Sequence, residues 1–141
     1  MQESDLLDVL ILAKEFSREA PKSHKWDSNK TSQFLKDCLD SPQYQIFISE
    51  TDGEVTGGIV CDITEMLMSY TKVATELAWF VSRDARGKTS SIKLVKAYEA
   101  WAKENGADYI IMGDIKGIGD LGRLYKRMNY SAVETAYMKE V

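Results

Sequence analysis

The sequence predicts an α/β fold in which one mixed, mostly antiparallel sheet carries helices on both faces. Three observations lead to this prediction. Apolar residues recur at helical spacing in some segments and as short strand-like runs in others. The Asp52-Gly53 pair lies between two strand-like runs, which is a strong signal for an antiparallel hairpin. The chain has 141 residues, 44% of them hydrophobic, so we expect residues 1–141 to form a single domain.

Two helices are expected first. Ser4 can cap a helix that ends before Pro21, and a polar loop from residue 19 to 29 follows it. The apolar residues that recur at helical spacing in this first helix are Leu6, Val9, Leu10, Ala13 and Phe16. A second helix is expected over residues 31–39 and should end before Pro42.

Strands are expected next, over residues 44–48, 55–63 and 73–81. Gly57-Gly58 permits a bend or a bulge in the second of them. Residues 66–70 are apolar but irregular, so we interpret them as the connection to the third strand.

A long amphipathic helix follows a polar turn at residues 86–91 and ends at Gly106. Its buried side should hold Ile92, Val95, Tyr98 and Ala102. The remaining expected elements are a strand over residues 107–113, a short helix within residues 121–130, and a closing strand over residues 132–141.

The polar turn is the most informative part of the chain. Small residues at the start of a helix leave several backbone N–H groups unpaired, and the positive end of the helix dipole lies behind them. Such a site favours a phosphate or diphosphate, and Arg86 and Lys88 add positive charge beside it. We therefore expect a phosphorylated ligand to bind at this turn.

Residues 86–91 resemble the acyl-CoA-binding motif of the GNAT superfamily of N-acyltransferases. In that motif an Arg or Gln is followed after two residues by Gly and, one residue further, by Gly or Ala. Arg86 stands at the first position, whereas Thr89 and Ser91 replace the small glycine-like residues. Residues 121–130 are similar to the family's second motif, with Asn129 in place of Gly. The resemblance covers nearly the whole chain, although the strand that usually opens the family's fold is expected to be short or missing.

The resemblance implies an N-acetyltransferase that moves an acetyl group from acetyl-CoA to a primary amine by direct attack in a ternary complex. Acetyl-CoA would be a co-substrate, and no metal would be needed. The resemblance also implies a splayed central strand pair, with residues 110–113 on one side. The backbone of Phe80, Val81 and Ser82 on the other side would pair with the pantetheine arm. The Val81 N–H would face the thioester carbonyl as an oxyanion donor.

The remaining ligand contacts follow from the same resemblance. Arg83 and Arg86 would contact the phosphates, although the alternative interpretation of Arg83, as an ordinary exposed arginine, is slightly favoured. The diphosphate cradle would be formed by Gly87, Lys88, Thr89, Ser90 and Ser91.

Tyr125 occupies the position of the family's motif tyrosine, which implies that it donates a proton to the CoA thiolate. A phenol with a pKa near 10 has a suitable basicity for that step, whereas the alternative role is that of a core aromatic residue. Glu76 is a candidate general base, acting through water. Asp114 and water alone remain as alternatives.

Composition excludes several other classes. The net charge of −4 argues against nucleic-acid binding, and the apolar runs are too short to span a membrane. Cys38 and Cys61 are expected to be buried free thiols, which indicates a cytoplasmic protein. A single histidine, His24, lies in a polar loop where we expect it to be solvated. With a single histidine and no cysteine cluster, a structural zinc site is excluded, and we expect no metal ligands.

Two hypotheses about partners remain. An active enzyme would take a small-molecule amine or a protein amine, and the apolar residues 66–68 together with the closing strand are compatible with a homodimer. The alternative is a catalytically inactive GNAT-like binding module that acts through protein–protein contacts. Thr89 and Ser91, which stand at glycine positions of the motif, favour this second hypothesis.

Overall fold

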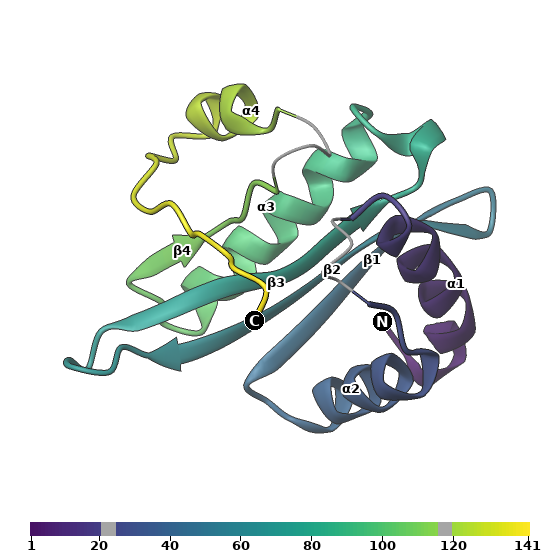
Figure 1. Ribbon diagram of the computed structural model, residues 1–141, viewed down its shortest axis with the longest axis horizontal. Helices are drawn as coiled ribbons and strands as arrows, with labels where there is room; N and C mark the ends of the chain where they lie inside the picture. The colour runs from purple at the N-terminus through teal and green to yellow at the C-terminus, as the bar shows by residue number, and fades with distance from the viewer. Residues whose placement is uncertain (21–24, 116–119) are drawn as a thin grey trace.

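The sheet has four strands in the order β1-β2-β3-β4 and lies between two helical layers in the computed structural model (Figure 1). The structure describes residues 1–20, 25–115 and 120–141, so His24 lies outside the described residues. The strands are β1 (Tyr44–Thr51), β2 (Glu54–Glu65), β3 (Lys72–Val81) and β4 (Tyr109–Ile111). The α-helices are α1 (Leu6–Ser17), α2 (Ser28–Asp40), α3 (Thr89–Glu104) and α4 (Gly122–Arg127). Two short 3-10 turns are η1 (Glu3–Asp5) and η2 (Arg83–Ala85).

The first three strands form an antiparallel meander, and β4 then pairs in parallel with β3. The Asp52-Gly53 turn adopts positive φ at both residues, as the hairpin signal predicts. The mixed and mostly antiparallel sheet is therefore confirmed.

Helices cover both faces of the sheet, also as predicted. α1 and α2 pack on one face and α3 packs on the other. The core on the α1/α2 face is formed by Val9, Leu12, Leu35, Cys38, Ile46, Val60 and Phe80. The core on the α3 face is formed by Ile59, Cys61, Ala74, Leu94, Tyr98 and Ala102. Cys38 and Cys61 are buried and free, which confirms that prediction.

Gly57 and Gly58 lie where neighbouring side chains leave no room for a Cβ atom on β2. A Cβ atom at Gly57 would lie 3.0 Å from Leu94 Cδ1 on the α3 face. A Cβ atom at Gly58 would lie 2.7 Å from the ring of Phe80, its cross-strand neighbour. The β1–β2 register also shifts beside these glycines, so Thr56 is an extra residue in β2.

Replacing Gly58 by alanine should lower the free energy of unfolding by about 1–3 kcal/mol, because the Phe80 ring would be pushed into a packed core. Urea denaturation measures this change. The double variant Gly58→Ala/Phe80→Leu should recover part of the loss, since leucine vacates the space that the new methyl group needs. An alanine variant as stable as the wild type would show that the ring is not confined there.

Two sequence predictions need correction. The predicted closing strand over residues 132–141 is wrong, because this segment has no secondary structure and is exposed along its length. A strand requires a hydrogen-bonding neighbour, and in the described residues no strand pairs with the outer edge of β4. On α3, Leu94 rather than Ile92 joins the fully buried positions.

At the N-terminus, the described residues hold no strand before α1; η1 leads directly into that helix instead. This agrees with the expectation that the first edge strand is short or missing. No helix among the described residues has both the length and the apolar character needed to cross a bilayer.

Candidate active site

The edge of β3 that faces β4 is open over its C-terminal half, and we call this open region the β3–β4 V. In the described residues β3 and β4 pair at Val73–Thr75 and Tyr109–Ile111, after which β3 continues to Val81 paired with β2 alone (Figure 1). The β2–β3 register shifts at the same level, which leaves Leu77 as an extra residue in β3. A bulge bends its strand and increases the local twist, and this one lies where the β3–β4 pairing ends.

The C-terminal half of β3 has backbone groups that face the open side of the V. Ser82 N donates to Thr56 O at 2.9 Å, so this residue pair belongs to the β2–β3 ladder. Because hydrogen-bonded pairs alternate along an antiparallel ladder, the backbone of Phe80 also faces β2, whereas that of Trp79 and Val81 faces away. The Val81 carbonyl accepts a hydrogen bond from Arg86 Nε at 3.0 Å, in keeping with this orientation.

This register alters the predicted contacts of β3. Val81 does lie on the open edge, as expected. The backbone groups of Phe80 and Ser82 instead face β2. The Phe80 side chain is buried in the core on the α1/α2 face. The second residue whose backbone faces the open edge is Trp79, and its side chain packs against the core on the α3 face.

Glu76 and Tyr125, the two predicted catalytic residues, meet at one peptide unit. Gly113 N donates to Glu76 Oε2 at 3.0 Å, and Tyr125 Oη donates to the Gly113 carbonyl at 2.6 Å. Glu76 comes from β3 at the base of the V, and Tyr125 comes from α4. Gly113 allows the Glu76 carboxylate to approach its backbone closely, because a Cβ atom there would lie only 3.3 Å from Glu76 Oε2. The exposed Asp114 follows directly.

Burial controls the protonation of both groups. It raises the pKa of Glu76 above its ordinary value of 4.5, and the Gly113 N–H only partly offsets this. Burial also raises the pKa of Tyr125, with further contributions from the negative charges of Glu76 and Asp114. Tyr125 is therefore a neutral hydrogen-bond donor at physiological pH, beside a carboxyl group with increased proton affinity.

The N-terminus of α3 lies just beyond the end of β3. Lys88 is its N-cap residue, and its side chain makes no capping hydrogen bond. Within the described part of the chain, the amides of Gly87, Thr89 and Ser90 make no hydrogen bond. Gly87 has φ +71°, and a Cβ there would meet nothing within 4 Å. Unpaired amides, an open approach and the helix dipole together make this turn suited to an anion.

Ser91 has a different role from the other residues of the turn. It is only 4% exposed, and its hydroxyl donates to the Lys88 carbonyl at 2.7 Å. Its amide is also bonded to Lys88 O. Ser91 therefore stabilises the shape of the turn, while the amides of Gly87, Thr89 and Ser90 remain available.

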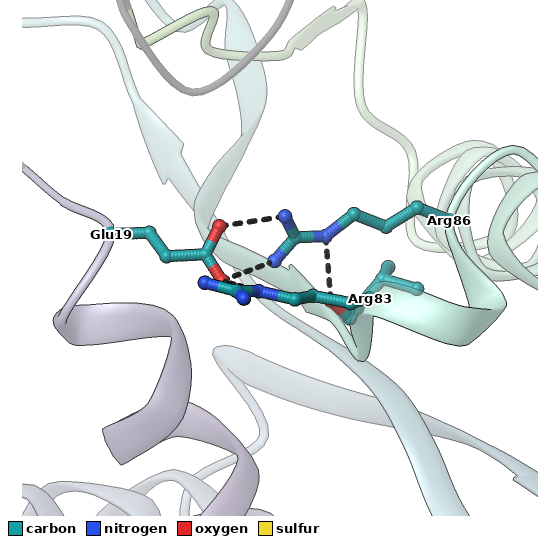
Figure 2. A network of polar contacts seen from close by, with 4 residues as sticks. Glu19, Arg83 and Arg86 are labelled. Atoms are coloured by element: carbon teal, nitrogen blue, oxygen red, sulfur yellow. Dashed lines mark hydrogen bonds and ion pairs between the residues drawn. The ribbon is translucent and has the colours of Figure 1, made fainter.

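Arg83 and Arg86 lie side by side, and both of their guanidinium groups donate hydrogen bonds to the carboxylate of Glu19 (Figure 2). Glu19 Oε2 accepts from Arg86 Nη1 at 2.7 Å, and Glu19 Oε1 accepts from Arg86 Nη2 and from Arg83 Nε, each at 3.1 Å. We call these three residues the arginine clasp. Hydrogen bonds from Arg86, followed by those from Arg83, hold the pKa of Glu19 at about 2, against the desolvation that burial imposes.

A cavity of about 450 Å³ lies beside the clasp. It is formed between the C-terminal half of α1, the end of β3 and η2, with Leu12, Phe16, Val81 and Ser82 in its lining. All three clasp residues also line this cavity.

Two site residues were not identified from the sequence. Glu19 falls in a segment predicted only as a polar loop, and 67 residues separate it from Arg86. Gly113 was predicted only as the end of a strand. No spacing in the sequence signals either contact, because both depend on how distant segments pack.

The chain is similar to known acetyltransferases. A family model described as the acetyltransferase (GNAT) family matches residues 9–129. An aminoglycoside N-acetyltransferase solved in complex with CoA has a TM-score of 0.82 at 14% sequence identity, over 100% of this chain and 91% of that one. An acetyltransferase from Trypanosoma brucei has a TM-score of 0.77 at 14% identity, over 100% and 96% of the two chains. A ribosomal-protein-alanine N-acetyltransferase from Brucella melitensis biovar Abortus 2308 has a TM-score of 0.76 at 13% identity, also over 100% and 96%. No curated protein matches the chain.

Proposed function

Because the chain belongs to the GNAT family of acetyltransferases, we propose that its single domain, residues 1–141, transfers an acetyl group from acetyl-CoA to a primary amine. Attack would be direct, within a ternary complex. The feature that carries the proposal is the uncapped N-terminus of α3 at the open end of the β3–β4 V. A family relative solved with CoA supports the choice of co-substrate.

The residues of this region fit the parts of CoA. The amides of Gly87, Thr89 and Ser90 suit the diphosphate, and Lys88 adds a positive charge. The open edge of β3 at Trp79 and Val81 offers donors and acceptors to the amides of the pantetheine arm, as an additional strand would use them. The Val81 N–H, at the C-terminal end of β3, would then donate to the thioester oxygen.

The proposed chemistry assigns a proton donor and a proton acceptor. Tyr125 carries its proton at physiological pH and would give it to the departing thiolate, exchanging its bond to the Gly113 carbonyl for that step. Glu76 would accept the proton of the attacking amine through water. Asp114 remains the alternative acceptor, since it is exposed and adjacent to Gly113.

A thermal-shift experiment tests cofactor binding directly. CoA present at a hundred times its dissociation constant should add about 2.7 kcal/mol of stability and raise the melting temperature by roughly 5–10 °C. A panel of primary amines, followed by release of the CoA thiol, then tests transfer. No thermal shift would instead favour the inactive binding module, for which Thr89 and Ser91 provide the sequence argument.

Replacing Glu76 by glutamine should separate stability from activity. The folded protein holds the Glu76 proton more tightly than the unfolded chain, so wild-type stability should fall as the pH rises from about 4.5 through the raised pKa. Glutamine removes this loss, and its amide oxygen can still accept from Gly113 N. The variant should therefore be more stable than the wild type at pH 7, while its turnover falls about 10²–10⁴-fold.

Denaturation at several pH values and steady-state kinetics measure the two effects. Asp114→Asn serves as the matched variant, because it removes a neighbouring carboxylate. A turnover loss in Asp114→Asn but not in Glu76→Gln would transfer the role of base to Asp114. Full activity in both variants would leave water as the acceptor.

A further inference from the structure

In the arginine clasp, the Glu19 carboxylate accepts hydrogen bonds from two guanidinium groups, which is also how arginines bind a phosphate. Glu19 presents two oxygens to the planar fork of Arg86 and shares one of them with Arg83. Guanidinium groups bind carboxylates and phosphates in this same bidentate manner. A diphosphate approaching the start of α3 would therefore compete with Glu19 for the same donors.

Arg86 also covers part of the open edge of β3. Its Nε donates to Val81 O while Nη1 and Nη2 donate to Glu19, so two partners hold the guanidinium group (Figure 2). The Val81 carbonyl is one of the acceptors that a pantetheine arm would use. The clasp thus engages a phosphate-binding group and a strand-edge acceptor at the same time.

The ion pairs are sheltered from water on one side. The Glu19 side chain is 23% exposed and that of Arg86 35%, whereas Arg83 is 80% exposed. Glu19 also lies just beyond the end of α1, where its amide bonds to the Phe16 carbonyl. This bond fixes the Glu19 backbone at the end of α1, from which its carboxylate reaches both arginines.

We propose that Glu19 is an internal competitor for the diphosphate site, which must release Arg86 and Arg83 before CoA binds. This inference rests on the proposed function. A site that is open for one tenth of the time binds its ligand tenfold more weakly than a site that is always open, so the clasp lowers the affinity for CoA.

Replacing Glu19 by glutamine tests the proposal through binding rather than activity. Calorimetric titration with inorganic pyrophosphate and with CoA should give dissociation constants about tenfold lower than those of the wild type, a gain of about 1.4 kcal/mol. Glu15→Gln is the matched control, because Glu15 lines the same cavity. It removes the same charge, and within the described residues it forms no ion pair. Its dissociation constants should stay within twofold of the wild-type values.

Glu19→Asp provides a second variant if the glutamine protein is unstable. Its carboxylate is one methylene shorter and reaches one arginine less well, so it should give a smaller gain of the same sign. Unchanged or weaker binding in Glu19→Gln would overturn the proposal, since Glu19 would then prepare the arginines for the ligand. An equal gain in Glu15→Gln would also overturn it, because general charge would explain both. Tighter pyrophosphate binding without any CoA binding would support the clasp and refute the proposed function.

Discussion

Replacing Tyr125 by phenylalanine should lower turnover about 10²–10⁴-fold while the dissociation constant of CoA stays within twofold. The hydroxyl is the group that would protonate the thiolate, and the ring that packs against Tyr130 is retained. Stability should fall by only about 0.5–1.5 kcal/mol, because the Gly113 carbonyl loses one hydrogen bond. Steady-state thiol release and calorimetry measure the two quantities.

Tyr98→Phe is the matched control for this prediction. Tyr98 is buried on α3 and donates its hydroxyl to the Ile111 carbonyl at 3.2 Å, so its variant loses the same kind of bond near the same strand. Turnover should be unaffected there. If the Tyr125 and Tyr98 variants lose activity equally, the role of Tyr125 is to support the fold.

Replacing Lys88 by aspartate should stabilise the protein and yet weaken CoA binding about 100-fold, a loss of about 2.7 kcal/mol. Lys88 is the N-cap residue of α3 with extended backbone angles, φ −85° and ψ 165°, and aspartate is favoured at such a position. Its carboxylate would take the free amides and repel the diphosphate. Stability should rise by about 0.5–2 kcal/mol for the same reason.

Lys88→Asn isolates the effect of charge. Asparagine also caps helices but carries no negative charge, so we expect a similar gain in stability and a smaller loss of affinity. Denaturation and calorimetric titration distinguish the two variants. Unchanged CoA affinity in the aspartate protein would show that the ligand does not use the start of α3.

Periodicity and turn chemistry were sufficient to predict most of the fold. The helices that became α1, α2 and α3 have apolar residues at helical spacing, and the Asp52-Gly53 pair has the backbone signal of its hairpin. Asn129 adopts φ +64°, as a left-handed cap requires. The closing strand failed because strand formation depends on an available neighbour as well as on composition.

The details of the site depend on contacts that no local pattern encodes. Whether Phe80 or Val81 faces the open edge is decided by the β2–β3 register, which the extra residue Leu77 shifts by one position. Glu19 reaches Arg86 across 67 residues of chain. The motif residues 86–91 could be located from the sequence, whereas the partner that occupies Arg86 could not.

The brevity of the β3–β4 contact has a consequence for local stability. Three residue pairs join β4 to the rest of the sheet, so this strand should open as a separate cooperative unit well before β1, β2 and β3 unfold. Amide hydrogens of Tyr109 to Ile111 would then exchange with solvent at a free energy far below that of global unfolding. A ligand that contacts both β3 and β4 would stabilise β4 against local opening and slow the exchange of its amide hydrogens.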